Sequence, residues 1–260
     1  MNDAADTTPL ASFEAKWSEA DPAFALAQRF VRDDREAKLA FACLVFEIEH
    51  AAFGIREAQP AAIKLQWWAE ELVRAGKGEA RHPLTQALGA RIAASIVPPM
   101  LWQQAILAAL AQRDPEPAAD MAALLDVHAP LYAPIGAIES TLFESDAAAV
   151  ASALSLMRAL RETAALPIAL RDGKLPLPLD RLARFRLSRG DLSTASPARA
   201  DALREQLRDL AERLRTLLER ADDHVAPEIL RHAFARDPRK SSGVGPSRCR
   251  AVPQQSCRPL

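Results

Sequence analysis

The chain has 260 residues, of which 49% are hydrophobic and 26% are charged, so it is long enough to bury a substantial core in one compact domain. Its 33 basic and 34 acidic side chains give a formal net charge of -1, which excludes the broad cationic field that nucleic-acid binding usually needs. We therefore expect no nucleic-acid partner.

The first ten residues are polar and acidic, without a basic start followed by an apolar run, and they predict no signal peptide. No segment reaches roughly 18 consecutive apolar residues, which argues against a membrane span and leaves peripheral membrane contact open. The three cysteines make a poor disulfide framework, because Cys43 occupies an expected core position and Cys249 and Cys257 lie in a polar tail. These features favour a cytoplasmic protein, with contact at the inner membrane as a further option.

The composition predicts an all-α fold. Alanine and leucine dominate, glycine occurs 9 times, and alternating runs of β-branched and aromatic residues are scarce. Prolines mark expected helix starts, as at Pro22 and Pro197, where Asp21 and Ser196 are suitable capping residues. In chain order we predict helices at residues 12–19, 22–31, 34–56, 60–75, 83–96, 99–112, 117–128, 134–143, 146–170 and 197–223.

Two later segments differ from this helical pattern. Residues 171–194 contain Pro176, Pro178 and two glycines, so they predict a long interruption of the kind that often carries function. In residues 237–260 alanine and leucine give way to proline, serine, arginine and glutamine, so we expect a disordered or non-native tail after a single domain of residues 1–236.

The last predicted helix has leucines spaced by three and four residues, which place them on one face. An amphipathic helix packed on its own core explains this stripe, and a short coiled-coil seam in a dimeric scaffold is the alternative. The stripe consists of Leu203, Leu207, Leu210, Leu214, Leu217 and Leu218.

Four sequence blocks carry a resemblance to a known family. They are LAFACLVFEIEH at residues 39–50, KLQWWAEEL at 64–72, HPLTQAL at 82–88 and GKLPLP at 173–178. Their order and spacing resemble the squalene/phytoene synthase family over roughly residues 20–225. The resemblance implies an isoprenoid-synthase-like helical bundle around a central cavity, and a Mg-dependent, head-to-head condensation of two prenyl diphosphates.

That chemistry depends on clustered carboxylates, because Mg²⁺ must neutralise the departing diphosphate. On a helix, carboxylates share a face when they are three or four residues apart, whereas Glu47 and Glu49 are two apart and point about 200° away from each other. At the second acidic motif that the resemblance implies, Ala165 and Ala169 replace the acids and only Asp172 stands near. We therefore predict no metal site, and a need for Mg²⁺ only if the chain is catalytically active.

Several residues remain candidates for a site. Glu47 and His50 are three apart and form either an acid/base pair in a cavity or a polar strip on a buried helix. Trp67 and Trp68 point about 100° apart, so at least one faces inward, either in the core or as the wall of an isoprenoid pocket. The basic candidates for diphosphate or headgroup binding, each otherwise a surface charge, are Arg56, Lys64, Arg161, Arg171 and Lys174.

The sequence thus favours a squalene/phytoene-synthase-like protein that is non-catalytic or altered and binds an isoprenoid, another lipid or a protein partner. The first alternative is an active head-to-head prenyl diphosphate transferase that builds its metal site from unexpected residues. The second is the dimeric scaffold that uses the leucine stripe.

Overall fold

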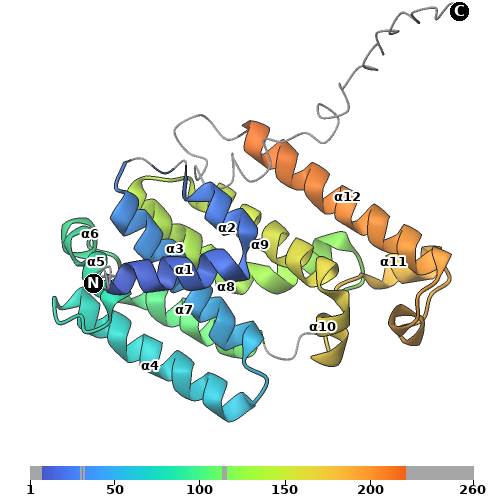
Figure 1. Ribbon diagram of the computed structural model, residues 1–260, viewed down its shortest axis with the longest axis horizontal. Coiled ribbons are helices and arrows are strands. Elements are labelled where there is room, and N and C mark those ends of the chain that lie inside the picture. The colour runs from blue at the N-terminus through green and yellow to red at the C-terminus, as the bar shows by residue number, and fades with distance from the viewer. Residues whose placement is uncertain (1–7, 30, 32, 113–115, 221–260) are drawn as a thin grey trace, which may run out of the picture.

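The computed structural model describes residues 8–29, 31, 33–112 and 116–220 (Figure 1). These residues form helices and no strand, which confirms the predicted all-α fold. The predicted tail at residues 237–260 lies outside the described part of the chain. The elements are α1 (Pro9–Ala20), α2 (Pro22–Ala27), α3 (Arg35–Glu49), η1 (His50–Gly54), α4 (Ala58–Gly76), α5 (Pro83–Ala87), α6 (Gly89–Ser95), α7 (Pro99–Ala111), α8 (Met121–Phe143), α9 (Ala147–Ala164), α10 (Leu166–Arg171), α11 (Leu179–Arg184), η2 (Gly190–Ser193) and α12 (Pro197–Arg220).

The long helices pack side by side in the order α4, α7, α8, α9 and α12, and α1 packs on α2 and α3 (Figure 1). The main core lies between α3, α4, α7 and α8, with Leu44, Ile48, Leu65 and Trp68 almost inaccessible to solvent. Burial of side chains of this size is the principal stabilising term of such a bundle. This core fixes the inner faces of α3 and α4, which carry the candidate residues.

Helix α8 corrects the prediction of separate helices at residues 117–128 and 134–143. It begins at Met121, where the Asp120 side chain accepts a hydrogen bond of 2.9 Å from the amide of Ala123, and it continues through Pro130 and Pro134. Each proline removes a backbone hydrogen bond. Because α8 is packed between α7 and α9, tertiary contacts outweigh that loss.

By length and composition α8 also resembles a membrane-crossing helix, with a mean hydropathy of 1.3 over its most apolar window. Half of that window is buried inside the protein, as is usual for the central helix of a packed core. In the described part of the chain, α8 is the single helix that passes this test.

Two other predicted helices are each divided into two. The prediction for residues 146–170 is wrong beyond Ala164, because Pro167 occupies the first turn of a separate helix, α10. The predicted helix at residues 83–96 divides at Leu88 into α5 and α6. The predicted interruption at residues 171–194 contains two short helical segments, α11 and η2.

The predicted helix at residues 34–56 changes after Glu49 into a π-helix, η1. The amide of Ile55 donates to the carbonyl of His50, five residues back, at 3.1 Å. The His50 ring lies against Gly54, where an added Cβ would be 2.4 Å from Nδ1. The wider turn therefore depends on a glycine beside the histidine. Such π segments are frequent at functional sites.

Candidate functional site

Glu47 lies on α3 with only 3% of its surface exposed, and two lysines from other helices hold its carboxylate. Lys16 of α1 donates a hydrogen bond to Oε1, and Lys64 of α4 donates to Oε2 at 2.7 Å. Burial alone would raise the pKa of Glu47, but the hydrogen bonds and charges of the two lysines outweigh it and lower the pKa. Glu47 is therefore an ionised carboxylate with a cation on each oxygen.

His50 follows Glu47 on the first turn of η1 and is exposed, with its ring 5.9 Å from the ring of Trp17. Partial burial lowers the pKa of His50, the charges of Lys64 and Lys16 lower it further, and Glu47 acts in the opposite direction. A neutral imidazole near pH 7 is the result. Both oxygens of Glu47 are bound by lysines, and no contact between Glu47 and His50 defines an acid/base pair in the described residues. The acid/base role of this pair stays a prediction.

Glu49 faces a different set of partners. Its Oε1 accepts a hydrogen bond of 2.5 Å from the Tyr132 hydroxyl of α8, and its Oε2 accepts one of 3.1 Å from Arg161 Nη1 of α9. The same guanidinium reaches Asp21 Oδ2 at 2.9 Å. Burial and the neighbouring charge of Glu49 raise the pKa of Tyr132, so the phenol remains a donor. Glu49 is thus a structural acceptor that joins α3, α8 and α9.

A second charged cluster surrounds Glu162 on α9. Its Oε1 accepts from Arg158 Nη2 at 2.6 Å and lies 3.6 Å from Lys174 Nζ, while His128 Nε2 is 3.8 Å from Oε2. Burial lowers the pKa of His128 to about 4, so this side chain is neutral at pH 7. Arg158 and Lys174 both lie over the ring of Phe53, at 3.7 Å and 4.5 Å from its centre. The carboxylate is again surrounded by cations.

The loop after α10 carries the remaining predicted residues. Gly173 has a φ of 78°, a left-handed conformation that ends α10 and allows the Lys174 amide to donate to the Ala169 carbonyl at 2.9 Å. Arg56 Nε donates to Asp172 Oδ1 at 2.9 Å, so Asp172 is also paired with a cation. Arg171 is exposed to solvent.

The two tryptophans behave as predicted, with one facing inward. Trp68 is 1% exposed and belongs to the main core, whereas Trp67 is 40% exposed. His82 lies 4.7 Å from the Trp68 ring and caps α5, because its Nδ1 accepts from the amide of Leu84 at 3.2 Å. His82 is thus the N-cap of α5. Of these two tryptophans, Trp67 is therefore the one that a ligand can reach.

The site residues do not fit a magnesium ion. Mg²⁺ requires several oxygen ligands in nearly octahedral geometry, usually including one or two carboxylates with free oxygens. In the described part of the chain no three histidine, cysteine, aspartate or glutamate side chains converge on one point. Glu47, Glu49 and Glu162 each meet lysine or arginine groups instead. These carboxylates are already neutralised by the protein's own cations.

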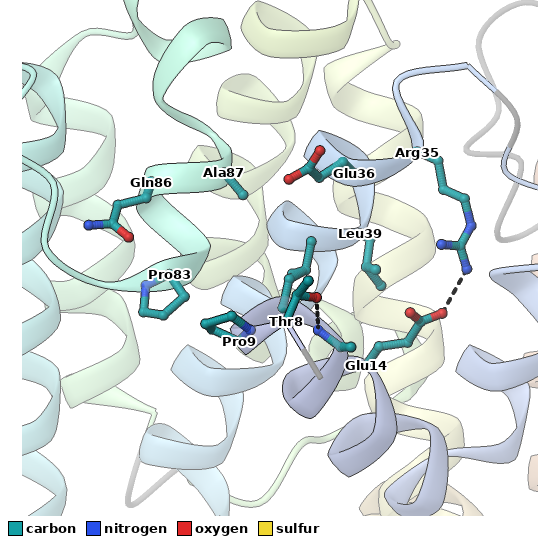
Figure 2. Close-up of a pocket in the computed structure, with 11 residues that line it drawn as sticks. Thr8, Pro9, Glu14, Arg35, Glu36, Leu39, Pro83, Gln86 and Ala87 are labelled. Carbon is teal, nitrogen blue, oxygen red and sulfur yellow. Dashed lines mark hydrogen bonds and ion pairs between the residues drawn. The ribbon is translucent and has the colours of Figure 1, made fainter. Parts of the chain in front are cut away.

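An open cleft of about 670 Å³ lies elsewhere, where α1, α3 and α5 begin (Figure 2). Glu14 and Arg35 form an ion pair of 2.7 Å at its side, and Pro83 and Gln86 line the wall opposite (Figure 2). None of the predicted catalytic or ligand-binding residues lines this cleft. It is therefore separate from the charged interior around Glu47.

Comparison with known proteins agrees with the sequence blocks. The squalene/phytoene synthase family model matches residues 19–236. The chain belongs to the squalene/phytoene synthase family. The fold is similar to that of squalene synthase HpnC from Alicyclobacillus acidocaldarius, with a TM-score of 0.63 and 16% identity over 90% of this chain and 94% of that one. A dehydrosqualene synthase crystallised with a ligand gives a TM-score of 0.65 and 15% identity over 87% and 83% of the two chains. No curated protein matches.

Family membership and the all-α isoprenoid-synthase fold are thereby confirmed. The sequence nevertheless missed several residues of the two interior charged clusters. Only Arg158 and Glu162 have a local signal, since a spacing of four residues favours a pair on one helix face. The other partners, for which sequence gave no signal, are Lys16, Asp21, His128 and Tyr132.

Proposed function

We propose that this chain is a non-catalytic, or strongly altered, member of the squalene/phytoene synthase family that binds an isoprenoid, another lipid or a protein partner. The observation that carries the proposal is the ion pairing of Glu47, whose two carboxylate oxygens each contact a lysine. Glu47 and Glu49 are the acids of the sequence block that resembles the family's metal-binding motif.

The physical argument concerns the leaving group. Ionisation of an allylic diphosphate places negative charge on its oxygens, and divalent cations held by free carboxylates must offset that charge. Here a divalent cation that binds Glu47 would have to displace two ammonium groups from a buried side chain. Arg161 gives Glu49 the same protection. The interior carboxylates therefore stabilise the fold through ion pairs and are not free to hold the metal ions that would activate a diphosphate.

The binding part of the proposal concerns groups that remain accessible. Trp67 offers an exposed aromatic face and Arg171 an exposed cation, so both suit an amphipathic ligand such as a lipid with an anionic headgroup. Arg56, Lys64, Arg161 and Lys174 are committed to carboxylates of the protein, so ligand binding by them would require exchange of those ion pairs. We place the protein in the cytoplasm, with peripheral contact at the inner membrane.

Incubation with farnesyl or geranylgeranyl diphosphate and Mg²⁺ tests the proposal, with diphosphate release as the readout. We expect no release above that of a protein-free sample. Metal-dependent release that falls in Glu47→Gln but not in Glu36→Gln would instead establish an active prenyltransferase. Glu36 is a matched control, because it lies on the same helix and is exposed.

A further inference from the structure

Helix α1 lies on the surface of the bundle and is held there by few side chains. Of its twelve residues, Trp17 is the one that is buried. The first half of α1 is not closely packed, because residues 8–11 and Glu14 line the open cleft of about 670 Å³ together with facing residues of α3 and α5 (Figure 2). The contacts that keep α1 in place are therefore concentrated in its second half.

The side of α3 that α1 covers carries the candidate acid. Leu39, Cys43 and Glu47 follow one another at intervals of four residues, so they form a row along one side of α3. Leu39 lines the cleft beside α1, and Lys16 of α1 donates a hydrogen bond to Glu47. Cys43 lies between these two points and is inaccessible to solvent. Helix α1 thus covers both Glu47 and the thiol one turn before it.

Two ion pairs join α1 to α3, and solvent reaches both. Lys16 binds Glu47, and Glu14 Oε1 lies 2.7 Å from Arg35 Nη2. The side chains of Lys16 and Arg35 are 47% and 46% exposed. Ion pairs with this much solvent contact stabilise a contact only weakly. Glu47 also keeps its second partner, Lys64, when Lys16 leaves. Separation of α1 from α3 therefore leaves no carboxylate without a cation in the interior.

Trp17 is held by packing but not by hydrogen bonding. Its ring stacks on that of Phe46 of α3, with 5.2 Å between the ring centres. Its buried indole Nε1 has no hydrogen-bond acceptor among the described residues. A buried donor without an acceptor is unfavourable, and water would supply the acceptor if α1 moved away from α3. The seated position of α1 therefore contains an unfavourable contribution that is relieved when the helix lifts.

The joint between α1 and α2 is anchored to the bundle. Asp21 follows α1 in an extended conformation, with φ -135° and ψ 99°. Its carboxylate lies 2.9 Å from Arg161 of α9 and accepts a hydrogen bond of 3.4 Å from the amide of Phe24 in α2. Residues at the ends of helices are those that usually absorb the change of backbone angles in a hinge. Asp21 is therefore a fixed point about which α1 can turn.

We propose that α1 is a lid that turns at Asp21 and opens the interior around Glu47. Lifting the lid removes Lys16 from one carboxylate oxygen, exposes the row from Leu39 to Glu47 and joins this space to the cleft. A ligand of the proposed function enters by this route, so the lid rests on that function for its ligand alone. Its test uses no ligand, and a failure of the test would leave the proposed function standing.

The rate at which dithiobis(nitrobenzoate) labels Cys43 measures the opening. The full chain is used with Cys249→Ser and Cys257→Ser, so that Cys43 is its one thiol. Burial raises the pKa of Cys43 to about 12, so the thiol is protonated and protected while α1 is seated. We expect labelling whose rate changes little with urea below the unfolding transition, because the lifting of one helix exposes little surface.

The variant Glu14→Gln/Lys16→Met removes both ion pairs of α1 and leaves the net charge unchanged. We expect it to speed the labelling of Cys43 by roughly fivefold or more. Lys16→Met alone replaces it if circular dichroism shows that the double variant is unfolded. Gly136→Ala is the matched control, because it disturbs the contact between α8 and α9 and lies outside α1. It should lower global stability and leave the labelling rate unchanged.

Three results would overturn the proposal. Labelling that is absent below the unfolding transition, or as steeply dependent on urea as unfolding itself, would show that Cys43 reacts only in the unfolded chain. Equal acceleration in Gly136→Ala would show the same. An unchanged rate in Glu14→Gln/Lys16→Met would show that these ion pairs do not hold α1 closed.

Discussion

At the scale of single residues, the shared carboxylate of Glu47 is the feature with the clearest consequences. Replacing both lysines, as Lys16→Met/Lys64→Met, leaves a carboxylate that is 3% exposed without these two partners. Because both lysines are partly exposed, we expect a loss of about 2 kcal/mol in the free energy of unfolding at pH 7, less than for a fully buried pair. Urea denaturation measures it, with exposed Lys77→Met as control. An unchanged midpoint would show that the lysines do not stabilise Glu47.

Glu71 gives a prediction about pH. Its Oε1 accepts hydrogen bonds from the Thr85 hydroxyl at 2.5 Å and the amides of Arg81 and His82 at 2.7 and 2.8 Å, while Arg74 binds Oε2 at 3.0 Å. Burial opposes ionisation, but these donors outweigh it and lower the pKa of Glu71 from 4.5 to about 2. The folded chain thus keeps Glu71 ionised where the unfolded chain protonates it.

This stabilisation is fully present above pH 4.5 and is lost as the pH falls from 4.5 towards 2, because the unfolded state then binds a proton that the folded state does not. Glu71→Gln should lower the free energy of unfolding by about 2 kcal/mol at pH 7 and flatten its decline in this acid range. Glu70→Gln, one residue earlier and 58% exposed, is the control. Equal acid sensitivity in wild type and Glu71→Gln would contradict the assignment.

At the same scale, the sequence predicted residues more successfully than contacts. It placed Cys43 and one tryptophan in the core, and both Cys43 and Trp68 are buried there. It did not predict the partners of Glu47 and Glu49, since Lys16 is 31 residues from Glu47, and Arg161 is 112 residues from Glu49. Contacts between residues so far apart in the sequence depend on how the helices pack. The spacing of residues along the chain does not reveal that packing.

At the scale of helices, α8 and α9 approach closely at Gly136. A Cβ at this position would lie 2.4 Å from the Ala147 carbonyl oxygen and 3.2 Å from the Ala151 amide, both of which are backbone atoms that cannot move aside easily. Gly136→Ala should therefore lower the free energy of unfolding by about 2 kcal/mol. Gly89→Ala is the control, because no atom lies within 4 Å of its Cβ. A stable Gly136→Ala variant would mean that the two helices are less closely packed.

Proline explains both the success and the failure of the helix predictions. Pro22, Pro99 and Pro197 begin helices as predicted, and the Ser196 hydroxyl accepts a hydrogen bond of 3.2 Å from the amide of Arg199. Pro134 does not begin one, because it is buried in α8, where packing on both sides outweighs a lost backbone hydrogen bond. A proline therefore marks a helix start only where no neighbouring helices hold the segment in place.

The leucine stripe of α12 was assigned correctly to the protein's own core. Leu210 and Leu214 are fully buried and pack with Ala153, Leu156 and Ala159 of α9. The amphipathic pattern predicted this burial without naming the partner helix. In the dimeric scaffold hypothesis these two leucines would form the dimer surface, but α9 of the same chain already covers them.

At the scale of the whole molecule, the fold class and family followed from composition and four short sequence blocks, and both are confirmed. The helix order was also predicted, apart from the segments joined in α8 and divided at Leu88 and Ala164. The sequence did not predict which long helices lie side by side, because an apolar helix face indicates burial but not which helix covers it. The observed order is α4, α7, α8, α9 and α12. The long-range ion pairs of Glu47 and Glu49 likewise could not be predicted from residue spacing.

The most direct test of these ion pairs is the melting temperature of the protein in Mg²⁺ with inorganic diphosphate. A ligand that binds only the folded state stabilises it by about 2.7 kcal/mol at a concentration one hundred times its dissociation constant. We predict no saturable rise in melting temperature, because Glu47 and Glu49 are already held by Lys16, Lys64 and Arg161. A saturable rise that requires both Mg²⁺ and diphosphate, and that Glu47→Gln removes, would contradict this account.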